Sequence, residues 1–144
     1  MRRAPEVTHK IMAAVKSKNT RPEVALRKAL WRRGLRFRVH YHGLPGKPDI
    51  VFTKVKIAVF CDGDYWHGHN WALRGMKNLE EELARYSEFW ANKIRRNIQR
   101  DEEVNRQLTT LDWQVLRIWE SEINKDIISC ALKVKQLIEE KRIR

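Results

Sequence analysis

The first clear pattern of polar and apolar positions begins at Thr20 and has the spacing of a helix. Thr20 and Glu23 stand three residues apart, as in a capping box, and Pro22 lies in the first turn. The apolar positions that follow are Val24, Leu26 and Leu30. Gly34 supplies a stop signal. The pattern predicts a helix between Thr20 and Gly34, and Glu23 is placed to complete its N-terminal cap.

Four segments have the alternating or β-rich composition of strands. They are residues 36–40, 50–52, 57–61 and 114–119. A short stretch rich in Lys and Thr separates the second from the third, so we expect a tight antiparallel turn between them. Asp49 then lies opposite Phe60, and the period-two alternation of a strand puts Asp62 on the same face of the sheet as Asp49.

Three further helices are expected outside these strands. A short one over residues 8–15 follows a polar start, and a long one spans residues 80–109 after a weakly patterned loop at residues 70–79. The apolar stripe of the long helix is Phe89, Trp90, Ile94, Ile98 and Leu108. Asn124 or Asp126 caps a terminal helix. Its apolar positions are Ile127, Ile128, Leu132, Val134 and Leu137.

The order of elements after the short first helix, α-β-β-β-α-β-α, is that of an α/β sandwich around a mixed sheet. A chain of 144 residues without internal repeats suits one domain, so we expect residues 1–144 to form a single unit. Cys61 and Cys130 lie far apart, which argues against a disulfide framework and against a cysteine-based metal site. Cys130 is most simply a buried helix residue.

The net charge of +12 is concentrated near the N-terminus. Residues 1–48 carry 13 Lys or Arg against two Glu, whereas residues 49–144 carry 17 against 16 acids. A basic segment of this kind, including an arm over residues 1–18, favours nucleic acid as a partner, with an anionic membrane as the weaker alternative. No apolar run approaches the roughly 18 residues that span a bilayer, and no signal peptide is evident, so we expect a cytoplasmic protein with no membrane partner.

Candidate chemistry gathers at the ends of the second and third strands. Asp49 and Asp62 are predicted to converge beside the backbone carbonyl of Cys61. Oxygen ligands of this kind suit Mg²⁺, which keeps positions open for water and substrate phosphate. The ordinary alternative is that both aspartates simply mark the ends of hairpin strands.

An ordered set of motifs makes the chain recognisable. They are Lys18 to Glu23, Leu44 to Asp49, Trp66 to His69, Glu88 to Trp90, Lys93-Ile94, Asn97, Arg100-Asp101 and Trp113 to Glu120. Together they resemble the very short patch repair (Vsr) DNA mismatch endonucleases over roughly residues 8–122. The resemblance implies a restriction-endonuclease-like three-layer sandwich around a mixed four-stranded sheet. It also implies Mg²⁺-dependent nicking of double-stranded DNA at T:G mismatches, and mismatch-repair proteins as further partners of a monomeric enzyme.

The same resemblance assigns roles in catalysis. His67 occupies the position of the family's general base, and Asp49 with the Cys61 carbonyl that of the metal ligands. Glu23 is placed as an acidic helper at the metal, an alternative to its role in the helix cap. Asp62 stands where relatives carry a histidine, so an additional acid enters the metal site. His40 and His42 are interpreted as surface or DNA-facing residues rather than metal ligands.

Contacts to DNA are expected from two regions. Tyr65 and Trp66, with Met12 from the N-terminal arm, lie where relatives insert apolar wedges between bases, although packing inside the protein is the plainer role. Lys93, Arg96 and Arg100 share one face of the long helix and are placed to bind phosphate. Their alternative role is a solvated face paired with nearby acids.

A structural zinc is not expected. Relatives bind zinc through three cysteines and a histidine, but here the cysteine positions hold Asp64, Trp71 and Ser121, and only His69 remains. This set is a poor match for a closed zinc site. We expect apolar packing, with Trp71 taking part, to hold the loop instead.

Two other functions compete with mismatch nicking. One is a related restriction or phage-defence nuclease with a different target. The other is a DNA-binding module that has lost catalysis, against which the joint presence of Glu23, Asp49, Asp62 and His67 argues.

Overall fold

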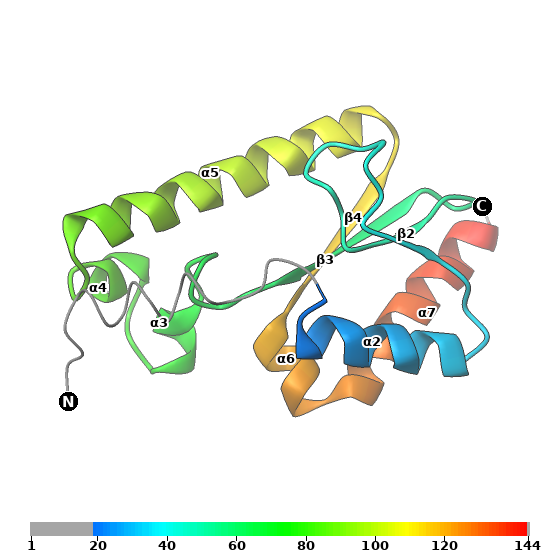
Figure 1. Cartoon of the computed structure of the whole chain (residues 1–144), viewed down its shortest axis with the longest axis horizontal. Helices are drawn as coiled ribbons and strands as arrows, with labels where there is room; N and C mark the ends of the chain where they lie inside the picture. The colour runs from blue at the N-terminus through cyan, green and yellow to red at the C-terminus, as the bar shows by residue number, and fades with distance from the viewer. Residues whose placement is uncertain (1–18, 144) are drawn as a thin grey trace.

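The computed structural model describes residues 19–143 of the chain. The expected basic arm over residues 1–18, its short helix and Met12 lie outside the described residues. The helices are α2 (Arg21–Arg32), α3 (Asn70–Leu73), α4 (Leu79–Leu83), α5 (Glu88–Thr110), α6 (Glu120–Lys125) and α7 (Ile127–Ile143) (Figure 1). The strands are β1 (Arg38–Val39), β2 (Ile50–Phe52), β3 (Ile57–Asp62) and β4 (Gln114–Trp119).

The four strands form one mixed sheet in the order β1-β2-β3-β4. β1, β2 and β3 pair antiparallel, and β3 pairs parallel with β4. Ile50 pairs with Val59, so the next position brings Asp49 level with Phe60, as predicted. Because the 63–113 segment connects two parallel strands, it has to cross the sheet, and α5 makes most of that crossing.

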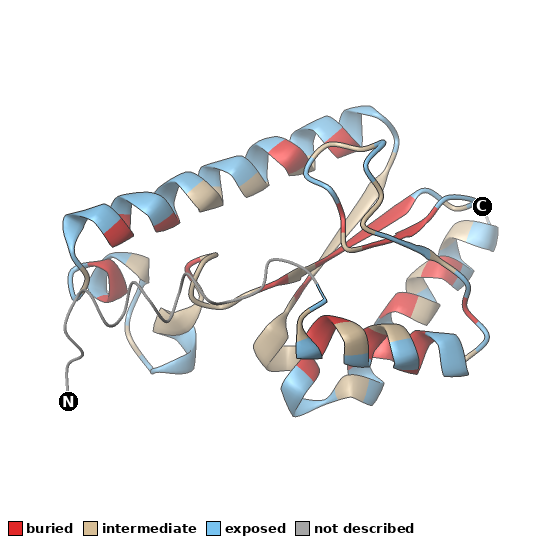
Figure 2. Ribbon diagram, in the orientation of Figure 1, coloured by how far each residue is buried: buried red, intermediate tan, exposed pale blue. Residues whose placement is uncertain are grey.

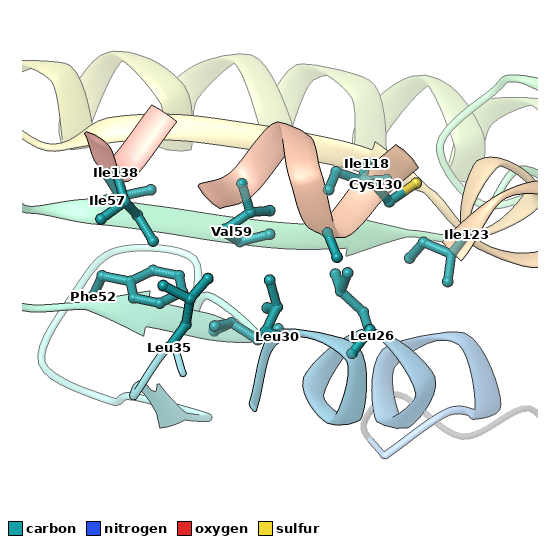
Figure 3. Packing of buried hydrophobic residues seen from close by; sticks show 14 residues of the cluster. Leu26, Leu30, Leu35, Phe52, Ile57, Val59, Ile118, Ile123, Cys130 and Ile138 are labelled. Atoms are coloured by element: carbon teal, nitrogen blue, oxygen red, sulfur yellow. The ribbon is translucent and has the colours of Figure 1, made fainter. Parts of the chain in front are cut away.

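Helices cover both faces of the sheet (Figure 1). Alternate residues of β3 divide between two apolar clusters, with Ile57 and Val59 in one and Ala58 and Phe60 in the other. The first cluster belongs to α2, α6 and α7, and in Figure 3 Leu26 and Leu30 of α2 point toward Val59. The second is closed by Val104 and Leu108 of α5. The buried residues in Figure 2 accordingly follow the sheet and the helix faces turned toward it. The expected three-layer, restriction-endonuclease-like architecture is confirmed.

Several expected boundaries were wrong. The first strand is only Arg38–Val39, because His40 has a φ of 50° and leaves the extended conformation. The single helix expected over residues 80–109 is two, α4 and α5. Asn78 and Ser87 each cap a helix by accepting a backbone N–H bond, at 3.0 Å from Glu81 and 3.4 Å from Trp90. A second cap therefore restarts the helix where the apolar pattern alone suggested continuity.

Burial also differs from the expected stripes near helix ends. Phe89 is 56% exposed, whereas Trp90 beside it is buried. In α7, Ile128 and Leu132 are about half exposed. Val134 and Cys130 are buried as expected, and Ala131 and Ile138 complete the buried face of the helix. Asp126, rather than Asn124, caps α7, since its Oδ1 accepts the Ser129 N–H at 3.0 Å.

Two short helices were not expected from the sequence. α3 lies within the segment predicted to be a loop, and α6 follows β4 directly. α6 contributes Ile123 to the cluster shared with α2 and α7. Among residues 19–143, no helix combines the length and the apolar composition that a membrane crossing requires.

Candidate active site

A cavity of about 430 Å³ lies where β2 begins and β3 ends. It is bounded on another side by the middle of α5. The predicted site residues that line it are Asp49, Cys61, Asp62, His67 and Arg100. Residues that the sequence distributes over three separate motifs therefore meet in one place.

Asp49 occupies a half-buried position in which its negative charge is poorly compensated. Its Oδ2 accepts the backbone N–H of Cys61 at 2.7 Å. Burial raises the pKa of Asp49 to about 7, and the charges of Glu23 and Asp62 act in the same direction while the Cys61 N–H opposes them. A carboxylate held under these conditions favours a bound cation, which supplies the missing positive charge.

Cys61 lines the cavity, but its thiol is a poor candidate for binding a cation. The side chain packs against the apolar cluster of α2 and α7. Burial raises the pKa of the thiol far above its usual range, and the Asp49 charge adds to the effect. A backbone oxygen suits a hard cation better than this thiol, and the Cys61 carbonyl as a metal ligand stays a prediction.

Glu23 uses its two carboxylate oxygens differently. Oε2 accepts the backbone N–H of Asn19 at 3.0 Å, and the Glu23 N–H is itself bonded to Thr20 Oγ1 at 3.4 Å, so the cap is formed. Oε1 is buried and makes no hydrogen bond among the described residues. His40 Nε2 is 3.1 Å from this oxygen, and ligand atoms of Glu23, His40 and Asp49 lie within 4.8 Å of one another. Glu23 therefore takes part both in the helix cap and in the polar site. The donor atoms of Glu23, His40 and Asp49 fit a divalent cation.

His67 is held between two acids on the other side of the cavity. Its Nδ1 is hydrogen-bonded to Oδ2 of Asp101, and its Nε2 is 3.8 Å from Asp62 Oδ1. Burial on its own lowers the pKa of His67, but the bond to Asp101 and the charge of Asp62 outweigh it and raise the pKa overall. From the sequence, Asp101 was expected only as one of the acids that pair with the cations of the long helix. Its place next to Arg100 in a matching motif was the only available signal.

Asp62 faces Arg117 rather than Asp49. Arg117 Nη1 lies 3.1 Å from Asp62 Oδ2 and 3.4 Å from Asp101 Oδ1. Burial raises the pKa of Asp62, although His67 and Arg117 oppose the shift. Asp49 and Asp62 line the same cavity. However, Asp62 groups with His67 and Asp101, whereas Asp49 groups with Glu23 and His40. A direct metal bond from Asp62 stays a prediction.

The loop after β3 is fixed largely by polar bonds around Asp64. Its Oδ1 accepts the Ser121 hydroxyl at 2.7 Å and meets His69 Nδ1 at 2.6 Å, and its Oδ2 accepts the Ser121 N–H at 3.0 Å. The His69 ring stacks on Trp119, with centroids 4.1 Å apart. The expectation that apolar packing with Trp71 holds the loop was therefore incomplete, since Trp71 is tied through its backbone N–H to Glu82 at 2.6 Å.

The two aromatic residues of this loop are half-buried. Tyr65 packs against the apolar cluster at the start of α5. Trp66 lies between Tyr65 and Trp90, with centroid separations of 5.2 and 5.5 Å, and its carbonyl accepts a bond from Asn97 at 3.0 Å. The rings of Tyr65 and Trp66 therefore pack against the protein on one side and stay partly exposed on the other. Their insertion into DNA stays a prediction.

The predicted phosphate contacts on α5 are available. Lys93, Arg96 and Arg100 are exposed, and within residues 19–143 none of them forms an ion pair with an acid. The neighbouring Arg95 and Arg106 are paired with Glu80 and Glu103 at 2.9 and 2.6 Å. In the described residues, the alternative in which all these cations form ion pairs with nearby acids is therefore not observed.

Comparison with known proteins identifies the family. The sequence model of the family described as DNA mismatch endonuclease Vsr matches residues 3–73. The type II nicking enzyme V.NmeDIP of Neisseria meningitidis serogroup C is 45% identical over 98% of this chain and 92% of its own length. The chain belongs to the Vsr family of DNA endonucleases. The type II nicking enzyme V.HpaIIP of Haemophilus parainfluenzae is 36% identical over 97% of this chain and 96% of its own length. The DNA mismatch endonuclease Vsr of Escherichia coli strain K12 is 36% identical over 77% of this chain and 67% of its own length.

Membership of the Vsr family makes DNA the macromolecule on which the site acts. The segment matched by the family model contains Glu23, Asp49, Asp62 and His67, whereas Asp101 lies beyond it. The basic N-terminal third agrees with a polyanionic partner, as do the cations of α5 that have no acidic partner among residues 19–143.

Proposed function

We propose that this Vsr-family endonuclease nicks one strand of double-stranded DNA at T:G mismatches and uses Mg²⁺ to do so. The observation that carries the proposal is the shared cavity. It combines a half-buried, poorly compensated Asp49 with a histidine that is oriented by Asp101. Hydrolysis of a phosphodiester needs both a place for a cation and a base for the attacking water.

Asp49 and the backbone carbonyl of Cys61 are the groups we propose to hold Mg²⁺, with Glu23 close by. When bound there, Mg²⁺ neutralises the charge that develops on the reacting phosphate. Asp49 is well suited to bind a cation because the negative charges of Glu23 and Asp62 lie close to it.

His67 is the proposed general base. The bond between its Nδ1 and Asp101 fixes the ring and leaves Nε2 to accept a proton from water. The water oxygen then attacks phosphorus, the bond from phosphorus to one bridging oxygen breaks, and one strand is cut. Arg117 contacts both Asp62 and Asp101, and its charge opposes the rise in the pKa of Asp62 that burial causes.

Selection of the mismatch is assigned to Tyr65 and Trp66. Opening a base step costs a few kcal/mol, and stacking on an aromatic ring returns about 1 to 3 kcal/mol per base. A step that is already weakly stacked, as at a mismatch, is therefore the favoured point of entry. Lys93 lies 5.1 Å from the centroid of the Trp66 ring, so a phosphate contact adjoins the proposed wedge.

A second candidate keeps the fold and the chemistry but changes the target. It is favoured by the names of relatives, since V.NmeDIP and V.HpaIIP are both called type II nicking enzymes. In this case the protein nicks DNA without requiring a T:G mismatch. Only the choice of substrate separates this candidate from the first.

Nicking of a supercoiled plasmid in Mg²⁺ tests the shared chemistry of both candidates, provided that the plasmid contains one T:G mismatch. We expect open circles before any linear product, and no conversion with Asp49→Ala. Unchanged cleavage by Asp49→Ala would remove the proposed site from the reaction. A matched plasmid that is nicked at the same rate would favour the second candidate.

A further inference from the structure

His40 belongs to the group of side chains around Asp49, although from the sequence it was interpreted as a surface or DNA-facing residue rather than a metal ligand. The ligand atoms of Glu23, His40 and Asp49 lie within 4.8 Å of one another. We propose that His40 is a direct ligand of the cation bound at Asp49, and that its nitrogen makes the site bind Mn²⁺ more tightly than Mg²⁺. The inference rests on the proposed function only for a cation at Asp49.

Three separate elements bring these ligands together. Glu23 comes from the first turn of α2, His40 follows β1, and Asp49 precedes β2. The backbone N–H of His40 donates to the carbonyl of Asp49 at 3.3 Å, which fixes the two residues side by side across the sheet. Any side chain at position 40 that points toward α2 therefore approaches the same space as the Asp49 carboxylate.

The backbone of His40 has a left-handed conformation, with a φ of 50°. Such values are uncommon among residues other than glycine, although histidine, asparagine and aspartate adopt them more often than most. Residues in sparsely populated conformations occur disproportionately at functional sites. The turn itself does not require an imidazole at this position.

Glu23 provides the independent sign of a ligand. Its side chain is 2% exposed, and Oε1 has no hydrogen-bond partner among the described residues. His40 Nε2 lies 3.1 Å from this oxygen and 3.2 Å from Asn19 Oδ1, and Arg27 Nη1 lies 3.9 Å from Glu23 Oε1. A buried carboxylate oxygen is seldom left without a partner, and a cation between Glu23, His40 and Asp49 would supply one.

The mixture of donors determines which cation fits. Two carboxylates alone suit Mg²⁺ and Mn²⁺ alike, but Mg²⁺ strongly prefers an all-oxygen shell. Imidazole nitrogen is a good ligand for first-row transition metals. His40 therefore adds more to the affinity for Mn²⁺ than to that for Mg²⁺.

Electron paramagnetic resonance of Mn²⁺ added to the DNA-free protein tests this directly. We expect spin-echo modulation from a ¹⁴N nucleus in the wild type. His40→Asn, a residue that tolerates positive φ, should abolish the modulation and weaken Mn²⁺ binding roughly tenfold or more. Binding of Mg²⁺, measured by calorimetry, should weaken less. His42→Asn is the matched control, because His42 lines the same cavity outside the ligand group, and it should keep both the modulation and the affinity.

The result that overturns the proposal is a His40→Asn protein that keeps its ¹⁴N modulation and its Mn²⁺ affinity, or a wild type without any modulation. His40→Gly provides a second variant suited to the backbone, and circular dichroism confirms folding of each. Because no DNA is present, the outcome is independent of nicking. An inactive protein with a His40-dependent Mn²⁺ site would contradict the proposed function alone, and an active one without it would contradict this inference alone.

Discussion

The imidazole of His67 and the carboxylate of Asp101 are hydrogen-bonded through Nδ1 and Oδ2, although 34 positions separate them in the sequence. His67 lies on the loop after β3, and Asp101 lies in the middle of α5. The long helix therefore does more than cover the sheet, because it fixes the orientation of the proposed base. Arg117 of β4 contacts Asp101 from the other side and holds that carboxylate in place.

Replacing either partner should lower the rate of nicking with little effect on DNA binding. His67→Ala removes the base, for which we expect a loss of about 10² to 10⁴-fold in kcat. Asp101→Asn keeps the shape but weakens control of the ring, so we expect a smaller loss, roughly 10- to 100-fold. Single-turnover nicking and DNA-binding measurements separate the two effects. A normal kcat for His67→Ala would assign the base to another residue.

Asp49→Asn should abolish nicking and cation binding while making the protein more stable at pH 8. The pKa of Asp49 rises from 3.8 to about 7 on folding, so the folded protein holds a proton that the unfolded chain has lost between these values. Wild-type stability consequently falls as the pH rises from about 4 to about 7. The amide avoids this cost, and we expect a gain on the order of 2 kcal/mol at pH 8 that shrinks toward pH 4.

Urea unfolding of wild type and Asp49→Asn at several pH values, without divalent cations, measures this difference. A stability difference that does not change with pH would mean that the Asp49 carboxyl is not the titrating group. Lys54→Ala, on the exposed turn between β2 and β3, is a suitable control.

Asp64→Ala should loosen the loop that carries His67. The substitution leaves the Ser121 hydroxyl and N–H and the His69 ring without their shared acceptor. We expect a loss of about 1 to 3 kcal/mol in the free energy of unfolding and a lower kcat. Asp64→Asn, which keeps an acceptor, should recover part of both.

Elemental analysis of the purified protein should find no tightly bound zinc, and one zinc per chain would point to Asp64, His69 and Ser121 as its ligands.

Neutralising Lys93, Arg96 or Arg100, which have no acidic partner in the described part of the chain, should weaken DNA binding in a salt-dependent manner. Lys93→Ala, Arg96→Ala and Arg100→Ala should each lower the salt dependence of binding by about one ion, with a similar loss on any DNA sequence. Arg106→Ala is the control, because its partner is Glu103 at 2.6 Å. If the salt dependence of DNA binding in all three variants equals that of Arg106→Ala, the predicted phosphate contacts are wrong. Affinities measured across a series of salt concentrations give the slopes.

The sheet was predictable from local patterns, but the environment of the site was not. Strand composition and a short turn were enough to place Asp49 level with Phe60, since pairing in a hairpin depends on residues close in sequence. Helix breaks depended on single capping residues such as Ser87, which the apolar stripe conceals. The exposure of Phe89 likewise followed from the new start of α5.

Long-range partners account for the rest. Asp62 was expected to join Asp49 because alternation puts both on one face of the sheet. Arg117 comes from the parallel strand beside it and captures the Asp62 carboxylate, an arrangement that only the sheet order determines. The place of His40 beside Glu23 depends on a positive φ, which no sequence pattern indicated.

The central claim is that this endonuclease cuts one strand at a T:G mismatch. Its most direct test is a competition in Mg²⁺ between two end-labelled duplexes of identical sequence, one matched and one with a single T:G pair, for wild type and Trp66→Ala. We expect the wild type to nick the mismatched duplex preferentially and in one strand, and Trp66→Ala to lose much of that preference while still binding DNA. Equal rates of nicking on the two duplexes by the wild type would contradict the account.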